Sequence, residues 1–180
     1  MHALIRRVSL LLLGVMACGL TTAYAQGEED AAPTAVAAVS AGAPRTDIYL
    51  APIGGADEYV LLGRARNLTP RVGYDNQPAF SADGRTLYYS AIHDDGQADV
   101  YRLALDTPDA APERLTYTAH MSEYSPTPMP GRGGLSTVRV EPDGAQQLWR
   151  LTEVGSDVGR IVPSLPTVGY HAWLDEEQLA

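Results

Sequence analysis

Two Asp-Gly pairs, Asp83-Gly84 and Asp95-Gly96, separate three short runs of β-forming residues in the middle of the chain. Asp-Gly between such runs is a strong signal for a tight hairpin turn, because glycine adopts a positive φ without steric cost. The run between the pairs, residues 86–92 (TLYYSAI), is rich in aromatic and β-branched residues. No run between the turns is long enough for three helical turns, so the stretch predicts an antiparallel meander.

The strands of this meander can be read from residues 76–116. A first strand ends just after Phe80, a third covers 99–105 (DVYRLAL), and a fourth closes the unit at 113–118. The second strand, 86–92, is apolar or aromatic on both faces, which is typical of a strand covered on both sides. Stacked propeller blades cover their strands in this way. We therefore predict one four-stranded blade of a β-propeller.

Parts of the same pattern recur before and after this blade. The expected units are a half blade of two outer strands at 46–69 with a loop at 52–56, the blade at 76–118, a variant blade at 123–165 whose last strand is 160–165, and the start of a further blade at 168–180. Pro78 and Pro126 mark equivalent points and are about 48 residues apart, close to the ~40–45 residues of a propeller blade.

The length of the repeat limits the fold. Residues 46–180 hold about three blades, whereas a closed propeller needs about four or more. The predicted fold class is therefore all-β, a partial β-propeller of about three four-stranded antiparallel blades that form an open arc. We expect the chain to be a fragment of a longer protein, or to need another copy or a partner, because bare blade faces and edges favour aggregation.

The N-terminus predicts export. Arg6 and Arg7 precede an apolar run at 8–20 that is too short to span a membrane comfortably. Ala23-Tyr24-Ala25 is typical of a signal-peptidase site, so residues 1–25 are expected to be a signal peptide and the expected compartment is the periplasm. The mature chain is expected to have no membrane span.

Cys18 is the only cysteine in the sequence. A lipoprotein anchored through Cys18 and an uncleaved N-terminal anchor stay open as alternatives. Cleavage after Ala25 would leave no thiol, so the fold must hold without disulfides. Residues 26–45 are rich in Ala, Pro and acidic residues and lack aromatics, which predicts a flexible linker, with a short helix in its Ala-rich part as the alternative.

The residues PAFSADGRTLYYS, followed by DVYRLAL and ERLT, resemble the PD40 repeat, also called the WD40-like β-propeller repeat. This repeat is found in the TolB periplasmic propeller and in the propellers of prolyl-oligopeptidase-type peptidases. The match covers 76–116 well and 46–69, 123–152 and 168–180 in part, and it departs from the pattern at Ala82, where proline is usual. The resemblance implies a module that binds proteins or gates a neighbouring domain, with no catalytic residues.

Several kinds of chemistry are excluded or disfavoured by residue type. The sequence has no lysine, which excludes a Walker A loop, a Schiff-base lysine and a Ser-Lys dyad. Residues 134–138 (GLSTV) begin like a nucleophile elbow, but they lack the final glycine and start a strand. We therefore predict no catalytic residue and no cofactor in this chain.

No metal site is predicted either. His93-Asp94-Asp95-Gly96 with Asp99 has the oxygens of a calcium loop, but turn preferences explain these residues better. His120 with Glu123, and His171 with Glu176, lack a recognised metal-ligand spacing.

The charge and the aromatic residues suggest the kind of partner. The formal net charge is −9, and losing Arg6 and Arg7 with the signal peptide would make it more negative, which disfavours nucleic acid. Aromatic residues on strands are expected in the core, but Tyr74, Tyr117 and Tyr124 could rim a partner-binding surface. The candidate contact residues are placed on the loops from a fourth strand to the next first strand: Tyr74, Asp75, Asn76, His120, Glu123 and Tyr124.

Two main functions fit these observations. The first is an exported TolB-like binding module for protein or peptide partners. The alternative is the gating propeller of a larger exported prolyl-oligopeptidase-type peptidase whose hydrolase domain is not in this sequence, and a weaker third is a structural envelope protein with no fixed ligand. The residues do not identify the partner, the oligomeric state, the full number of blades or any domain beyond Ala180.

Overall fold

The computed structural model describes residues 45–56 and 59–180, so the predicted signal peptide and nearly all of the predicted linker lie outside the described residues. Every regular element in the described part is a β-strand. No helix there is long and apolar enough to cross a bilayer. The chain divides into two compact units: the described part of the first is 49–68, and that of the second is 45–48 with 69–180.

The first complete sheet, blade 1, matches the predicted meander. It consists of β5 (Tyr74–Phe80), β6 (Thr86–Ile92), β7 (Ala98–Ala104) and β8 (Glu113–Arg114), antiparallel and in sequence order. We name the four strands of a blade a to d in this order. The predicted turn between a and b is confirmed, because Gly84 has a φ of 72° and its N–H donates to the Ser81 carbonyl over 2.9 Å.

The second sheet, blade 2, repeats this order. It consists of β9 (Ser122–Pro128), β10 (Leu135–Val140), β11 (Gln146–Leu151) and β12 (Asp157–Arg160). The predicted position of its last strand, 160–165, was wrong. The N–H of Gly155 donates to the Thr152 carbonyl over 3.0 Å, so the chain reverses directly after β11. The last strand therefore begins at Asp157, before the predicted start at Arg160.

Both a strands carry a bulge at the same point. Gln77 and Ser125 have φ values of 54° and 53°, and each lies where the pairing with strand b changes register. The bulge explains how Pro78 and Pro126 can lie inside a strand rather than at its start. The side-chain Oε1 of Gln77 accepts a hydrogen bond from the N–H of Ser125 over 2.9 Å and so joins the two bulges.

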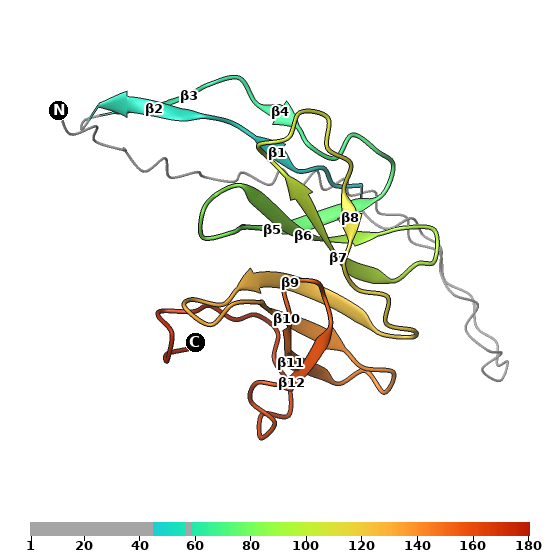
Figure 1. Cartoon of the computed structure of the whole chain (residues 1–180). Helices are drawn as coiled ribbons and strands as arrows, with labels where there is room; N and C mark the ends of the chain where they lie inside the picture. The colour runs from blue at the N-terminus through green and yellow to red at the C-terminus, as the bar shows by residue number, and fades with distance from the viewer. Residues whose placement is uncertain (1–44, 57–58) are drawn as a thin grey trace, which may run out of the picture. The chain divides into compact units, whose positions relative to one another are not determined.

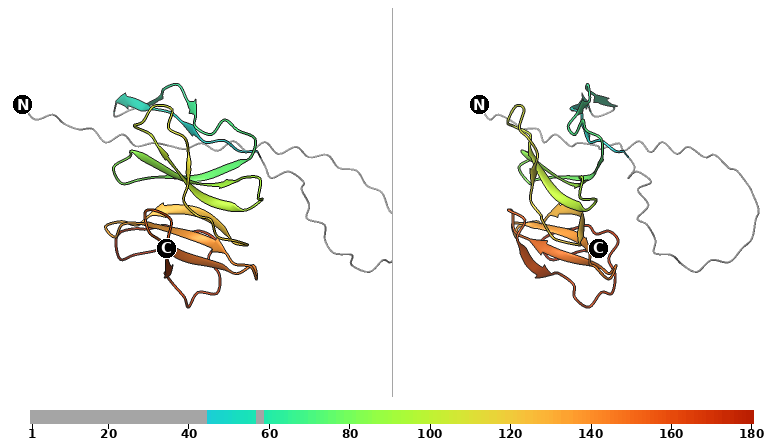
Figure 2. Two further views of the ribbon diagram at one scale, coloured as in Figure 1. Left: turned by 45° about the vertical axis from the view of Figure 1, so that its right-hand side comes forward. Right: turned by 90° about the vertical axis from the view of Figure 1, so that its right-hand side faces the viewer.

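The two blades lie face to face (Figures 1 and 2), and β9 contacts β5, β6 and β7. The layer between them is the hydrophobic core of the unit: Tyr88, Val100, Leu115, Leu135 and Leu151. Burying large apolar side chains here stabilises the stack by roughly 1.5–3 kcal/mol for each residue.

The last residues form a short hairpin. Trp173 bridges Leu179, which corresponds to the pairs Phe80–Leu87 and Pro128–Leu135 at the a–b turns of the two blades. The Ala172 and Ala180 backbones exchange hydrogen bonds of 2.8 and 2.9 Å. The start of a further blade at 168–180 stays a prediction.

The first unit contains two short strand pairs. β1 (Tyr49–Leu50) pairs with β4 (Arg66–Asn67), as the predicted outer strands should. The loop predicted at 52–56 was wrong, because β2 (Ile53–Ala56) pairs with β3 (Tyr59–Leu62) in a local hairpin. The predicted fold class is confirmed: the chain is all-β, with four-stranded antiparallel sheets of a partial propeller that is not closed.

Candidate functional site: the loop face

Strand order brings all d-to-a connections and all b-to-c turns of the second unit to one end of its sheets. Strand a begins at this end, b ends there, c begins there and d ends there. We call this end the loop face and define it by residues 70–73, 93–97, 117–121, 141–145 and 163–169. Binding residues of rigid β folds are commonly carried on such connections.

The connection before blade 1 is fixed by an ion pair whose carboxylate is buried. Asp75 on β5 is buried, and its Oδ1 accepts a hydrogen bond from the Arg71 guanidinium over 2.7 Å. Arg71 also donates to the backbone carbonyls of Tyr74 and Ile92, over 3.1 and 3.0 Å. Burial raises the pKa of Asp75 and Arg71 opposes that rise. Arg71 thereby holds the start of strand a against the end of strand b.

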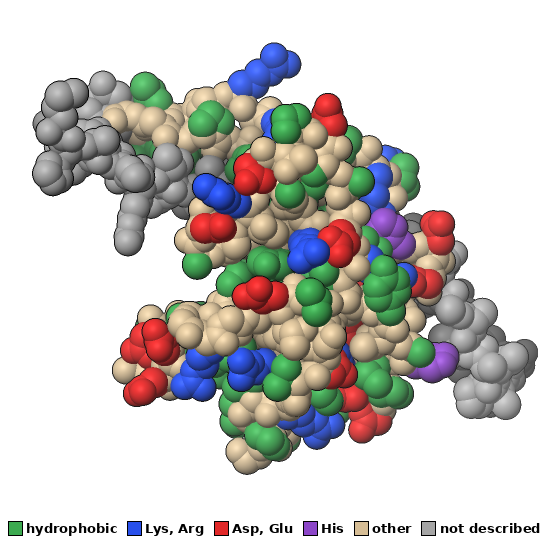
Figure 3. All heavy atoms as spheres, viewed as in Figure 1, with side chains coloured by type: hydrophobic (Ala, Val, Ile, Leu, Met, Phe, Trp, Pro, Cys, Tyr) green, Lys and Arg blue, Asp and Glu red, His purple; other side chains and the backbone are tan. Residues whose placement is uncertain are grey.

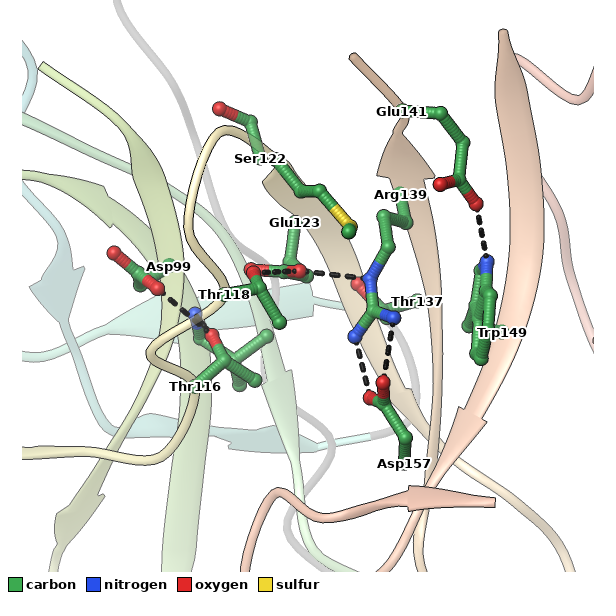
Figure 4. A network of polar contacts seen from close by, with 12 residues as sticks. Asp99, Thr116, Thr118, Ser122, Glu123, Thr137, Arg139, Glu141, Trp149 and Asp157 are labelled. Atoms are coloured by element: carbon green, nitrogen blue, oxygen red, sulfur yellow. Dashed lines mark hydrogen bonds and ion pairs between the residues drawn. The ribbon is translucent and has the colours of Figure 1, made fainter. Parts of the chain in front are cut away.

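Blade 2 has a larger network at the equivalent point (Figure 4). Glu123 follows Asp75 by about 48 residues, the length of one repeat, and is fully buried. Its Oε1 accepts hydrogen bonds from Arg139 Nε over 2.8 Å and from the hydroxyl of Thr118. The network thus connects strand a of blade 2 to the 117–121 connection.

Arg139 is the centre of this network. Its side chain is 1% exposed, and its two terminal nitrogens donate to both carboxylate oxygens of Asp157 over 2.9 and 2.6 Å. The guanidinium also lies 4.4 Å from the ring centre of Trp149, whose indole N–H donates to Glu141. Burial lowers the pKa of Arg139, but Asp157 and Glu123 raise it more, so the side chain stays charged. A fully buried cation is thus paired on two sides, as burial requires.

A second ion-pair group lies at the end of β8. Arg114 contacts Asp99 over 2.6 Å and Asp95 over 2.9 Å, and the Thr116 hydroxyl donates to Asp99 over 3.1 Å. Burial raises the pKa of Asp99 to about 6, against the lowering effects of Arg114 and Thr116. The backbone on both sides of the 117–121 connection is therefore anchored by charged side chains.

Large apolar side chains project from three successive d-to-a connections. Val72, Tyr117 and Leu165 are 74%, 72% and 45% exposed. Arg114 lies 4.7 Å from the ring centre of Tyr117, so the exposed ring rests on the ion-pair group. On the face drawn in the space-filling view, acidic, basic and apolar side chains are interspersed, without one broad basic area (Figure 3). The loop face therefore offers apolar contacts on a rigid polar support.

The placement predicted for the candidate contact residues was right for one of them. His120 lies in an exposed connection, with a φ of 62°. The others were wrongly placed on loops, because the a strands begin before their bulges: Tyr74, Asp75 and Asn76 lie in β5, and Glu123 and Tyr124 lie in β9. Their role in partner contact stays a prediction, and buried Asp75 and Glu123 could act only by supporting the surface.

The structure also brings together residues that sequence reasoning did not combine. Burial is the main cause that raises the pKa of Tyr74. The nearby hydroxyl groups of Tyr124 and Tyr170 raise it further. Tyr170 is exposed and follows Tyr74 by two repeats. Arg139 and Val72 were missed. Blade 1 has Ala91 at the position equivalent to Arg139, so an arginine there is a difference between the two repeats.

Ser136 of blade 2 and His171 of the C-terminal hairpin form a close pair. Ser136 is fully buried in β10, and its Oγ lies 2.7 Å from His171 Nε2. The hydroxyl also lies within hydrogen-bonding distance of the Thr127 carbonyl, at 3.2 Å, and accepts from the Trp173 indole N–H, at 2.9 Å. The tautomer of His171 decides which of Ser136 and His171 is the donor in their contact. Burial lowers the pKa of His171 and so favours its neutral form.

Among described residues, no group of three or more His, Cys, Asp or Glu side chains could hold a metal ion. Among these residues, neither His120 with Glu123 nor His171 with Glu176 is joined by a third His, Cys, Asp or Glu side chain that could complete a metal site. Glu123 is instead occupied by Arg139.

The fold and loop face define a β-propeller module, and comparison with solved structures agrees. An Agrobacterium tumefaciens protein assigned as TolB matches 66% of this chain and 42% of its own length, with 23% identity and a TM-score of 0.50. A structure from a study of two prolyl endopeptidases matches 75% of this chain and 19% of its own, with 14% identity and a TM-score of 0.54. No family model and no curated protein matches the sequence. The chain thus has a TolB-like propeller fold and spans less than half the length of these structures.

Proposed function

We propose that this chain is an exported propeller module that binds a protein or peptide partner through its loop face and performs no catalysis. The observation that carries this proposal is the set of exposed apolar side chains on successive connections, Val72, Tyr117 and Leu165. Aromatic and aliphatic anchors on a rigid support are typical of protein-binding surfaces.

The support beneath these anchors favours binding over a purely structural role. Arg71, Arg114 and Arg139 hold their connections through paired carboxylates, so little conformational freedom is left to lose on association. The excess of acidic residues, with a formal net charge of −9, favours a partner with basic residues and disfavours nucleic acid.

Export and a non-catalytic role rest on the sequence and on one buried group. Arg6 and Arg7, the apolar run and Ala23-Tyr24-Ala25 support a signal peptide and hence the periplasm. Ser136 is fully buried in β10, and residues 134–138 lack the final glycine of a nucleophile elbow, which supports a non-catalytic role.

Site-specific photo-crosslinking in the native host tests the proposal. A photoreactive residue at Tyr117 is expected to give one discrete adduct with a protein partner, and Val72→Asp is expected to abolish that adduct. Val154 is the matched control position, because it is 65% exposed but lies on the c-to-d turn at the opposite end of blade 2. No adduct at position 117, or the same adduct from both positions, would contradict the proposal.

A second candidate is the gating propeller of a larger exported peptidase. The match to a prolyl endopeptidase structure, at a TM-score of 0.54, supports this candidate. The coding sequence after Ala180 separates the two candidates. About three more blades and a stop codon would support the binding module, whereas a hydrolase domain with a G-x-S-x-G elbow would support the peptidase.

A further inference from the structure

The ribbon of the first unit opens at a bulge between its two strand pairs. Leu50 pairs with Arg66 on one side of the opening, and Ile53 pairs with Leu62 on the other. Two residues span this interval on the first strand and three on the second, so one residue is in excess. Bulges of this kind bend a strand and redirect its side chains, and they are frequent beside binding sites.

Close backbone contact keeps the opening in place. The Gly63 N–H donates to the Pro52 carbonyl over 2.8 Å, and a Cβ at position 63 would lie 2.5 Å from Pro52 Cγ. Only glycine allows the strands to approach so closely here. Beside this contact lies a cavity of about 380 Å³, lined by Leu50, Ala51, Pro52, Arg64 and Arg66. Its volume is within the range of small-molecule sites.

Two arginines at this cavity are free to bind an anion. Arg64 and Arg66 are both exposed, and both line this cavity. Neither has an ion pair within residues 45–56 and 59–180, whereas Arg71, Arg102, Arg114, Arg139 and Arg160 all do. Guanidinium groups bind carboxylates in a planar, two-pronged geometry.

We propose that this cavity is a second binding site, separate from the loop face, for a carboxylate carried on a short apolar group. Arg64 and Arg66 bind the carboxylate, and Leu50 and Pro52 contact the apolar group. Two sources present this chemistry, a short aliphatic acid and the C-terminal residue of a peptide that ends in an apolar side chain.

The test is titration of the isotope-labelled full chain with hexanoate, N-acetyl-leucine and acetate, followed by NMR. Hexanoate or N-acetyl-leucine is expected to give saturable shifts of the Leu50, Arg64 and Arg66 amides, at least ~10-fold tighter than acetate. Tighter binding of hexanoate indicates an aliphatic acid, and tighter binding of N-acetyl-leucine indicates a peptide C-terminus.

Variants connect the signal to the two arginines. Arg64→Gln with Arg66→Gln is expected to weaken binding at least ~10-fold, and each single change to weaken it less. Arg85→Gln is the control, because Arg85 is also exposed but lies on the a–b turn of blade 1, and it should bind normally. The double change to Lys should give intermediate affinity, because it keeps the charge and loses the two-pronged geometry. No saturable shifts, equal binding of acetate, or unchanged affinity in the double Gln variant would overturn the proposal.

Discussion

Blades 1 and 2 place a buried carboxylate at the same point of strand a but neutralise it from different directions. In blade 1, Arg71 reaches Asp75 from the preceding connection. In blade 2, Arg139 reaches Glu123 from the neighbouring strand b, where it is the direct cross-strand partner, and blade 1 has Ala91 at that position. The two blades therefore share the position of the buried carboxylate, whereas the arginine that pairs with it comes from a different position in each blade.

The two ion pairs differ in burial, and this difference should determine how much each pair affects the free energy of unfolding. The Arg71 side chain is 28% exposed, whereas that of Arg139 is 1% exposed. Water can replace part of the hydrogen bonding and charge stabilisation that Arg71 supplies to Asp75. It cannot reach Glu123 without opening the layer between the blades. The paired charges of blade 2 should therefore be much more sensitive to substitution.

The largest effect is expected for Arg139→Met. This change keeps most of the side-chain volume but leaves the Glu123 charge buried without its cation, which should lower the free energy of unfolding by about 3–5 kcal/mol. Chemical denaturation monitored by circular dichroism measures it. Arg102→Met is the control, because Arg102 pairs with an exposed Glu113 and should cost about 1 kcal/mol or less. Equal losses in the two variants would remove the special role of Arg139.

Arg71→Met, the matched change in blade 1, should cost less, about 1–2 kcal/mol, because the pair is partly solvated. The same denaturation experiment compares it with Arg139→Met. A loss as large as that of Arg139→Met would show that the two blades depend equally on their cations and would break the comparison.

Positions that are equivalent in the two blades should respond equally to the same substitution. Gly96 and Gly144 occupy the same b-to-c turn, with φ values of 75° and 84°, and a Cβ would meet no atom within 4 Å at either position. Valine at either site should therefore cost only backbone strain, roughly 1–3 kcal/mol. Denaturation midpoints of the two variants should agree, and Gly→Asn at each site should restore part of the loss, since Asn tolerates this conformation. A clear difference between the sites would contradict a common turn.

A pH dependence should come from a buried carboxyl group that blade 1 has and blade 2 lacks. Burial raises the pKa of Asp99 to about 6, and blade 2 has Gln147 at the same place. The folded chain therefore binds this proton more tightly than the unfolded chain, whose aspartates titrate near ~3.9. Its contribution to stability is full below about pH 4 and declines as the pH rises through about 6. Asp99→Asn should flatten that part of the profile of unfolding free energy against pH, and an unchanged slope would contradict the assignment.

The sequence identified the features that depend on local chemistry. The Asp83-Gly84 turn and strand β6 could be predicted, because Asp-Gly and a run of aromatic and β-branched residues act over short distances. The start of β5 could not, since the bulge at Gln77 lets a proline lie inside the strand. Strand β2 was missed because its IGGA sequence has low strand preference and forms only by pairing with β3.

The candidate site was harder to predict for a related reason. A charged residue in a strand normally faces water, and nothing near Arg139 in the sequence indicates that it is buried. Its burial depends on Glu123 and Asp157, which come from two other strands of the blade. Conversely, Glu123 and Asp75 were predicted to lie on a contact surface because they were assigned to d-to-a connections, whereas they lie in β9 and β5.

A double-mutant cycle on Glu123 and Arg139 tests most directly whether the cation is present to neutralise the buried carboxylate. Glu123→Gln removes the charge and keeps an oxygen that accepts from Thr118. If the account holds, Glu123→Gln in the Arg139→Met background should restore stability, with a coupling energy of about 1–3 kcal/mol. Additive losses, with a coupling below about 0.5 kcal/mol, would contradict it.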